Sequence, residues 1–138
     1  MPLTLTLSEN VLTNDQIRTA VEELSASMLE WHGLTGNSVM TPNVTANVHI
    51  VPKGFSFTGG KPFDAVWVEW KVPSFAFASR DVQKGFGEDA TRIIHELTGG
   101  ALPVDNIYFN VLHTVDGAWN LDGRAMSNEE LGEAIAKG

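Results

Sequence analysis

Alternating hydrophobic and polar residues occupy the very start of the chain. Leu3, Leu5 and Leu7 alternate with Thr4 and Thr6. This period of two is typical of a strand with one buried face, and threonine is common in strands. The first strand is therefore predicted to begin at about residue 2.

Two amphipathic helices are predicted from apolar residues that recur three and four positions apart. The first begins at a capping-box pattern, Thr13 followed by Gln16, and ends near Gly33. The second follows Ser79 and Asp81, which are both suitable N-caps, and ends before a pair of glycines. Each helix presents one apolar stripe, which must pack against another layer of the fold.

Three further strands are predicted from alternating or β-branched and aromatic runs. These segments are 44–50, 65–72 and 107–112. The glycine-rich segment 53–62 separates the second strand from the third and is predicted to form a turn or a short hairpin. The chain thus contains the order strand, helix, strand twice. We interpret residues 1–138 as a single domain of two pseudo-repeats, about 1–58 and 59–125, followed by a C-terminal tail.

The predicted fold class is α/β (α+β), with two β-α-β units that form one four-stranded sheet. Because each crossover is helical, the strands of each unit should be parallel, and right-handed connections place both helices on one face. Apolar residues such as Leu3, Val48, Val68 and Trp70 suggest that the other sheet face is also apolar. A monomer rarely exposes such a face, so oligomerisation is expected.

Composition excludes several classes of function. The net charge of −8, with nine scattered Lys and Arg residues, disfavours nucleic acid and anionic membranes as partners. The absence of cysteine excludes disulfides and thiolate chemistry and leaves the compartment open. There is no signal peptide and no apolar run long enough to span a membrane, so a cytoplasmic location is expected. The four histidines show no spacing typical of a metal site, and neither a metal nor another cofactor is expected.

Several segments resemble the tautomerase superfamily. The stretches VHIVPKGFSFTGG (48–60) and IYFNVLHTVDGAWNLDGRA (107–125) resemble the macrophage migration inhibitory factor branch. The ending AWNLDGRA is also similar to malonate semialdehyde decarboxylase, and HGLTG (32–36) is similar to cis-3-chloroacrylic acid dehalogenase. The resemblance implies a homotrimer whose sheets face inward, with an active site at each subunit boundary.

The resemblance also implies that Pro2, freed by removal of Met1, is the catalyst. As a general base it would transfer a proton between the enol and keto forms of a small 2-oxo acid or an aromatic enol. Asn110 is implied as a donor to the enolate oxygen, and Tyr108 as a pocket residue supplied by a neighbouring subunit. The alternatives are that Pro2 merely starts an edge strand and that Tyr108 and Asn110 face solvent.

Three more positions are candidates for binding a small-molecule substrate. Lys71 ends the third strand beside the aligned pocket position Val72, and its ammonium either pairs with a substrate carboxylate or is solvated. Arg124 either binds a carboxylate or pairs with Asp122 or Glu129.

Tryptophans are expected to pack and also to wall the pocket. Trp119 belongs to the aligned Trp-Asn pair, and Trp31 takes the place of the histidine that ends the first helix in the dehalogenase. Both are large apolar groups with a polar N–H, which suits them to the edge of a binding site.

The chain also departs from its relatives. Thr41 replaces the lysine that precedes the second strand in the cytokine branch, whose CxxC sequence is absent. The segment VPSFAFAS is apolar up to Arg80, where other branches have arginines. Two alternative functions therefore stay open. One is a catalytically silent, trimeric ligand-binding protein, and the other is a decarboxylase or hydratase that uses protonated Pro2.

Overall fold

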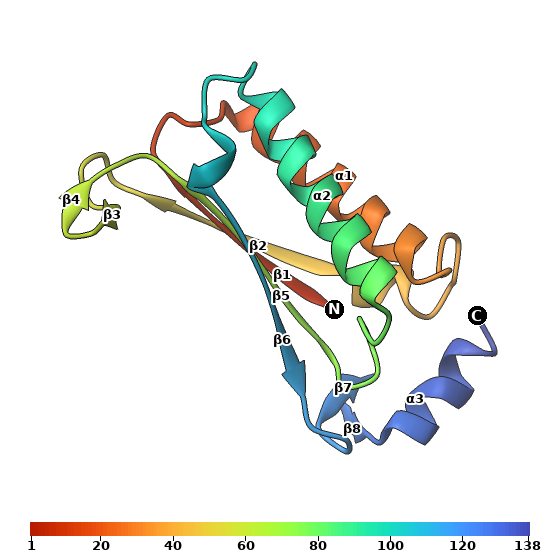
Figure 1. The fold of residues 1–138 in the computed structure, drawn as a ribbon. Helices are drawn as coiled ribbons and strands as arrows, with labels where there is room; N and C mark the ends of the chain where they lie inside the picture. The colour runs from red at the N-terminus through yellow and green to blue at the C-terminus, as the bar shows by residue number, and fades with distance from the viewer.

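A four-stranded mixed sheet with two long helices on one face forms the body of the protein (Figure 1). The computed structural model describes residues 1–138. Its main elements are β1 (Pro2–Ser8), α1 (Asn14–Trp31), β2 (Thr45–Val51), β5 (Val66–Pro73), α2 (Arg80–Leu97) and β6 (Ile107–Thr114). The strand order is β2-β1-β5-β6, in which β1 pairs parallel with β2 and β5 pairs parallel with β6. The two predicted β-α-β units are confirmed, and they join through the antiparallel pair β1–β5.

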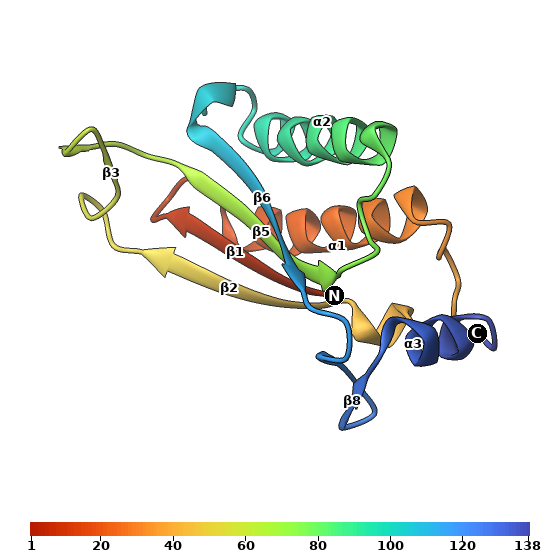
Figure 2. The ribbon, with the colours of Figure 1, turned by 60° about the horizontal axis from the view of Figure 1, so that its bottom comes forward.

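Shorter elements lie beyond both ends of the four-stranded sheet (Figure 2). They are the hairpin of β3 (Phe57–Thr58) and β4 (Lys61–Pro62), the hairpin of β7 (Trp119–Leu121) and β8 (Arg124–Met126), the helix α3 (Asn128–Ile135) and the 3-10 turns η1 (Thr41–Asn43) and η2 (Val104–Asn106). The first hairpin confirms the turn or hairpin expected between the halves, whereas the second hairpin and α3 were not anticipated. None of the helices has the length and apolar character that a membrane span requires.

Capping explains where the helices begin. Thr13 accepts a hydrogen bond from the backbone N–H of Gln16, whose side chain accepts one from the Thr13 backbone, so the predicted capping box is confirmed. Ser79 caps α2. A second capping box, formed by Ser127 and Glu130, begins α3. Each box pairs backbone donors that the first turn of a helix leaves free.

The uncovered face of the sheet is mixed, and the four residues from which an apolar face was predicted do not lie on it. Leu3, Val68 and Trp70 are at most 1% exposed, because their side chains face the core under α1 and α2. The apolar residue Val48 lies on the edge strand, in register with buried Leu5. The opposite positions of the four strands carry the polar residues Thr4, Thr6, Asn47, His49, Glu69, Lys71 and Asn110 together with Val51, Trp67, Tyr108 and Leu112. The strand register, which sequence alone does not give, decides which set is buried.

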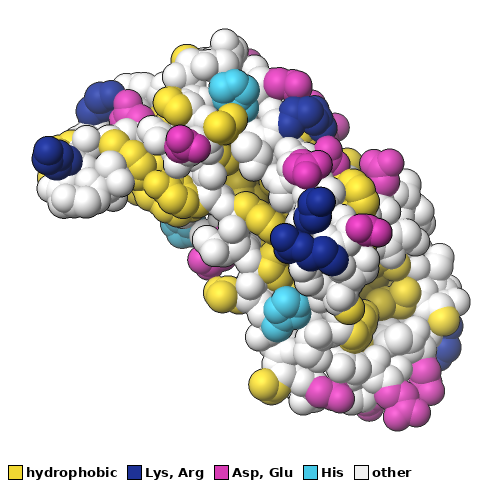
Figure 3. All heavy atoms as spheres, viewed as in Figure 1, with side chains coloured by type: hydrophobic (Ala, Val, Ile, Leu, Met, Phe, Trp, Pro, Cys, Tyr) yellow, Lys and Arg dark blue, Asp and Glu magenta, His cyan; other side chains and the backbone are white.

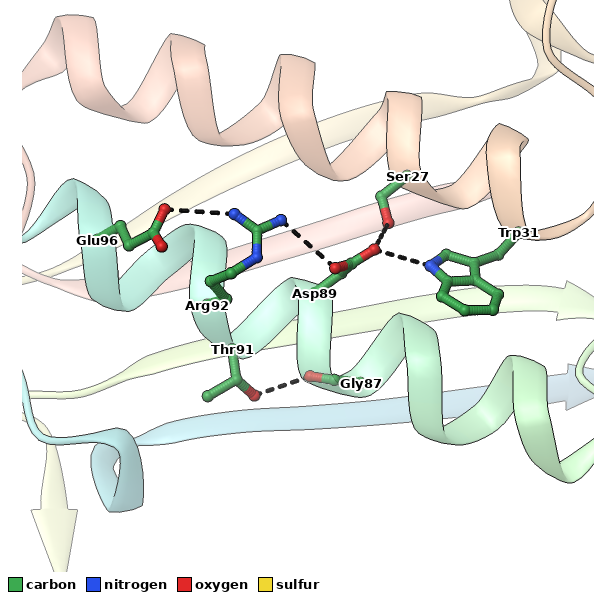
Figure 4. A network of polar contacts seen from close by, with 7 residues as sticks. All are labelled: Ser27, Trp31, Gly87, Asp89, Thr91, Arg92 and Glu96. Atoms are coloured by element: carbon green, nitrogen blue, oxygen red, sulfur yellow. Dashed lines mark hydrogen bonds and ion pairs between the residues drawn. The ribbon is translucent and has the colours of Figure 1, made fainter.

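One carboxylate joins the two long helices (Figure 4). Asp89 on α2 accepts hydrogen bonds from Trp31 Nε1 at 2.8 Å and from Ser27 Oγ at 3.2 Å, both on α1. Arg92, one turn further along α2, donates to the other oxygen of Asp89 at 3.4 Å. The Trp31 ring lies so close to Gly85 that a Cβ there would come within 2.1 Å of the ring. Trp31 is therefore a packing residue between the helices, and it lies outside the pocket described below.

We expect Asp89→Asn to lower the free energy of unfolding by about 1–2 kcal/mol, because hydrogen bonds to a charged acceptor contribute more than neutral ones. The hydrogen bond from Trp31, with those from Arg92 and Ser27, lowers the pKa of Asp89 below its ordinary value of 3.8. This contribution should therefore be complete above pH 3.8 and disappear as pH falls through the lowered pKa.

Urea unfolding at pH 7 and at pH 3 measures both effects. Glu96→Gln is the matched control, since Glu96 forms only an exposed ion pair with Arg92 and should change stability by less than about 0.5 kcal/mol. Equal losses in the two variants would show that Asp89 does not join the helices.

Candidate active site

The amino terminus is buried at the end of the sheet where β1 and β2 begin. The Met1 side chain is 2% exposed and belongs to the hydrophobic core. Its amine donates to the backbone oxygen of Asn43 and, at 2.8 Å, to Asn43 Oδ1. Its carbonyl oxygen accepts from the backbone N–H of Thr45 at 3.3 Å. Three hydrogen bonds to the start of β2 thus fix the first residue of the chain.

Burial changes the acidity of this amine. Removal from water disfavours the charged ammonium, and the pKa of the Met1 amine falls from 8.0 to about 5. No acidic side chain forms an ion pair with it. The amino terminus at this position is therefore neutral at pH 7, which is the form of an amine that can accept a proton.

A pocket of about 340 Å³ opens beside the terminus. Met1, Pro2, Asn43, Thr45, Lys71 and Trp119 lie among its lining residues. They converge because β1 and β2 begin at this end of the sheet, whereas the antiparallel strand β5 ends there, close to β7. The pocket brings together three of the residues singled out in the sequence, namely Pro2, Lys71 and Trp119.

Lys71 is the cation of this pocket. Leu3 pairs with Trp70 across β1 and β5, and the next residues along the two strands are Pro2 and Lys71. Both of these residues lie on the uncovered side of the sheet. Lys71 is exposed and forms none of the ion pairs of the chain, so its ammonium is available to an anion in the pocket.

Trp119 forms a wall of the pocket. It is 5% exposed, and its Nε1–H is buried without a hydrogen-bond partner. A buried donor without a partner costs about 1–3 kcal/mol, so such donors are rare in native proteins. Trp119 is therefore a packing residue of the pocket wall with a buried N–H that has no partner in the chain.

The other predicted site residues lie elsewhere in the chain. Tyr108 and Asn110 are on the uncovered face of β6, where Tyr108 stacks on Trp67 with the ring centroids 5.8 Å apart. Val72 is fully buried on the helix-covered side of the sheet. Arg124 lines a separate pocket of about 370 Å³ between the β7–β8 hairpin and α3, and it forms no ion pair with Asp122 or Glu129. One chain therefore does not place these four residues around Pro2.

Two residues of the pocket were missed in the sequence. Asn43 and Thr45 hold the terminus through hydrogen bonds, and both lie at the entrance to β2. The register of β2 against β1 brings them beside residue 1. The only signal in the sequence is the Pro-Asn pair directly before the strand, which marks a turn but not a site.

The chain has the fold of the tautomerase superfamily. It resembles the solved structure of Pt0534 inactivated by 2-oxo-3-pentynoate, with a TM-score of 0.77 and 14% identity over 96% of this chain and 99% of that one. It resembles a symmetric trimer of fused wild-type 4-OT, with a TM-score of 0.78 and 10% identity over 96% of this chain and 99% of that one. It also resembles N1, a member of the cis-3-chloroacrylic acid dehalogenase family, with a TM-score of 0.75 and 10% identity over all of both chains. No family model matches the sequence, and neither does any curated protein.

Proposed function

We propose that this protein is a tautomerase that transfers a proton between the enol and keto forms of a small 2-oxo acid or an aromatic enol. Pro2 is the general base after Met1 has been removed. The observation that supports this most strongly is that Pro2 and the unpaired ammonium of Lys71 share one pocket at a buried terminus. Pt0534, which shares the fold, was solved after inactivation by a 2-oxo compound, and this supports the choice of substrate class.

The proposed chemistry follows from the position of the terminus. Removal of Met1 converts the Pro2 nitrogen from an amide to a secondary amine. Burial and the neighbouring ammonium of Lys71 both disfavour a second positive charge and so favour the neutral form of this amine. It takes a proton from the carbon next to the substrate carbonyl, and Lys71 pairs with the carboxylate. The negative charge that develops on the carbonyl oxygen requires hydrogen-bond donors nearby.

A homotrimer would place further donors in the site. The fused 4-OT structure, which has the same fold, is a trimer. In the present chain Phe55 and Phe57, near the β3–β4 hairpin, are 70% and 54% exposed, and Figure 3 shows hydrophobic side chains at the surface beside this hairpin. We propose that a neighbouring copy covers them and that Tyr108 and Asn110 of one subunit complete the pocket of the next.

We expect light scattering to give a mass close to three times the 15.0 kDa of the chain. Phe57→Glu should shift the mass toward 15.0 kDa, because a charge cannot be buried unpaired in an apolar interface. A monomeric wild-type protein would contradict the trimer and leave Tyr108 and Asn110 without a role at Pro2.

Two alternatives are distinguished by the state of Pro2. While Met1 is present the Pro2 nitrogen is an amide, and the firm burial of Met1 favours a catalytically silent protein that binds a ligand in the same pocket. A decarboxylase or hydratase would need protonated Pro2, and the low pKa of the buried Met1 amine at this terminus disfavours that form at pH 7.

We expect enol-to-keto turnover of a phenylpyruvate-type substrate only in protein shown by mass spectrometry to lack Met1. Protein that retains Met1 should be at least about 100-fold slower, which is the lower end of what a general base contributes. Because the base acts when neutral, kcat/KM should fall as pH decreases through the pKa of the Pro2 amine. Burial disfavours the charged form of an amine at this terminus, as it does for Met1, so we expect activity to persist at pH 7. Equal rates with and without Met1 would contradict the role of Pro2.

We expect Lys71→Gln to lower kcat/KM about tenfold for a carboxylate substrate, mainly through a higher KM, because it removes one charge-assisted contact. The methyl ester of the same substrate should be affected much less. Steady-state kinetics on the acid and the ester measure the difference. Lys84→Gln is the matched control, since Lys84 is an exposed lysine of α2 without an ion pair. Equal losses on acid and ester would show that Lys71 does not bind the carboxylate.

A further inference from the structure

The pocket that Arg124 lines is built from segments near the C-terminus. It lies between α3 and the β7–β8 hairpin, which pack side by side beyond the end of the sheet (Figure 2). Its volume of about 370 Å³ falls within the range of about 300–1,000 Å³ that is usual for small-molecule sites. No residue of this pocket also lines the pocket at Pro2, so it is a separate site that the proposed function does not use.

The floor of this pocket is apolar. Leu121 and Met126 of the hairpin are 6% and 5% exposed and belong to the hydrophobic core. Val39 and Ala134, which also line the pocket, pack against that core. A hydrocarbon group that rests on this floor leaves water together with the floor, so the pocket favours a ligand with an apolar part.

Charges of both signs form the rim. Arg124 and Lys137 supply two cations, and Asp122, Glu130 and Glu133 supply three carboxylates, all of them exposed. Glu130 accepts a hydrogen bond in the capping box of α3. Glu133 and Lys137 have the spacing of an i,i+4 ion pair, but neither they nor Arg124 and Asp122 belong to an ion pair of the chain. Two cations and two carboxylates of the rim are thus available to a ligand.

A rigid frame carries these charges. Residues 122–123 form the two-residue turn of the hairpin, and both have positive φ, 52° and 73°, as in a type I′ turn. Arg124 follows directly in β8, where it pairs with Leu121 of β7. One residue separates β8 from α3, and Asn37 Nδ2 donates to the carbonyl oxygen of Ile135 at 2.9 Å near the other end of α3. A frame that is formed in advance lowers the entropy cost of binding.

We propose that this pocket binds a free α-amino acid with an apolar side chain. The Arg124 guanidinium pairs with the carboxylate of the ligand, and Glu133 pairs with its ammonium. Its side chain rests on the apolar floor. A ligand with only a negative charge would be opposed by the carboxylates of the rim, and one with only a positive charge by its cations. The inference makes no use of Pro2 and is independent of the proposed function.

Titration of ¹⁵N-labelled protein with L-leucine tests the site. We expect saturable NMR shifts at the backbone amides of Gly123 and Ala134, with a Kd below about 1 mM for a ligand of this size. The amide of Thr45, which lines the pocket at Pro2, is the reference and should not shift. No saturation at about ten times that concentration, or shifts that are largest at Thr45, would overturn the inference.

Analogues that lack one charge separate an amino-acid site from a simple ion site. The acid 4-methylpentanoate has no ammonium, and 3-methylbutylamine has no carboxylate. Each should bind at least about tenfold more weakly than leucine, because one charge-assisted contact is lost and one group of the rim is opposed. Equal affinities for leucine and 4-methylpentanoate would overturn recognition of the ammonium.

Substitutions assign the two contacts. Arg124→Gln should weaken binding of leucine about tenfold, and Arg124→Lys should restore part of the loss, since it keeps the charge without the bidentate fork. Glu133→Gln should weaken leucine about tenfold but should not weaken 4-methylpentanoate, which has no ammonium to pair.

Glu129→Gln is the matched control, since Glu129 is an exposed carboxylate of the same helix that does not line the pocket. All these variants should unfold at the urea concentration of the wild-type protein, because the substituted side chains are exposed and unpaired. Equal affinities of the Glu133 and Glu129 variants for leucine would overturn the proposed site.

Discussion

Burial of the first strand is the constraint on which the candidate site depends. β1 begins at Pro2, and its inward side chains Leu3, Leu5 and Leu7 are at most 1% exposed between the sheet and the helices. Because the strand starts at residue 2 and lies inside the sheet, the terminal nitrogen cannot move out into water without losing this packing. The low pKa of the Met1 amine is therefore a consequence of the fold and requires no special charged neighbour.

The two functional interpretations of this terminus, an enzyme and a silent binding protein, differ in one peptide bond, which joins Met1 to Pro2. With Met1 in place, Asn43 and Thr45 form hydrogen bonds with the amine and the carbonyl oxygen of Met1. The Pro2 nitrogen is then part of a peptide bond, so its lone pair is delocalised and it cannot act as a base. Without Met1, the strand keeps its packing while the same polar groups face an open space. Similarity at 10–14% identity shows the fold, which enzymes and binding proteins share.

Local sequence patterns predicted the main helices and strands well, but they did not predict the contacts between these elements. The Thr13 capping box and the alternation of β1 specify structure within a few residues, and both are found where expected. The Ser127 capping box has the same pattern and could have revealed α3. The composition of the outer face and the contacts of Asn43 both depend on the register between strands, which no local pattern contains. The composition of the outer face and the contacts of Asn43 were missed because they depend on register, whereas α3 was missed although its capping box is a local pattern.

One chain supplies only some of the polar groups that the proposed chemistry requires. Within one chain, Lys71 is the only charged side chain that lines the pocket, and the segment that follows β5 is apolar up to Ser79 except for Ser74. A single ammonium and one backbone N–H suit a substrate with one carboxylate. Thr114 lines the pocket, whereas Asn110 lies four residues earlier on β6, about 13 Å away at the usual rise of a strand. Asn110 and Tyr108 can act on a substrate at Pro2 only if a second copy brings them there. The roles proposed for these two residues therefore depend on the oligomeric state of the protein.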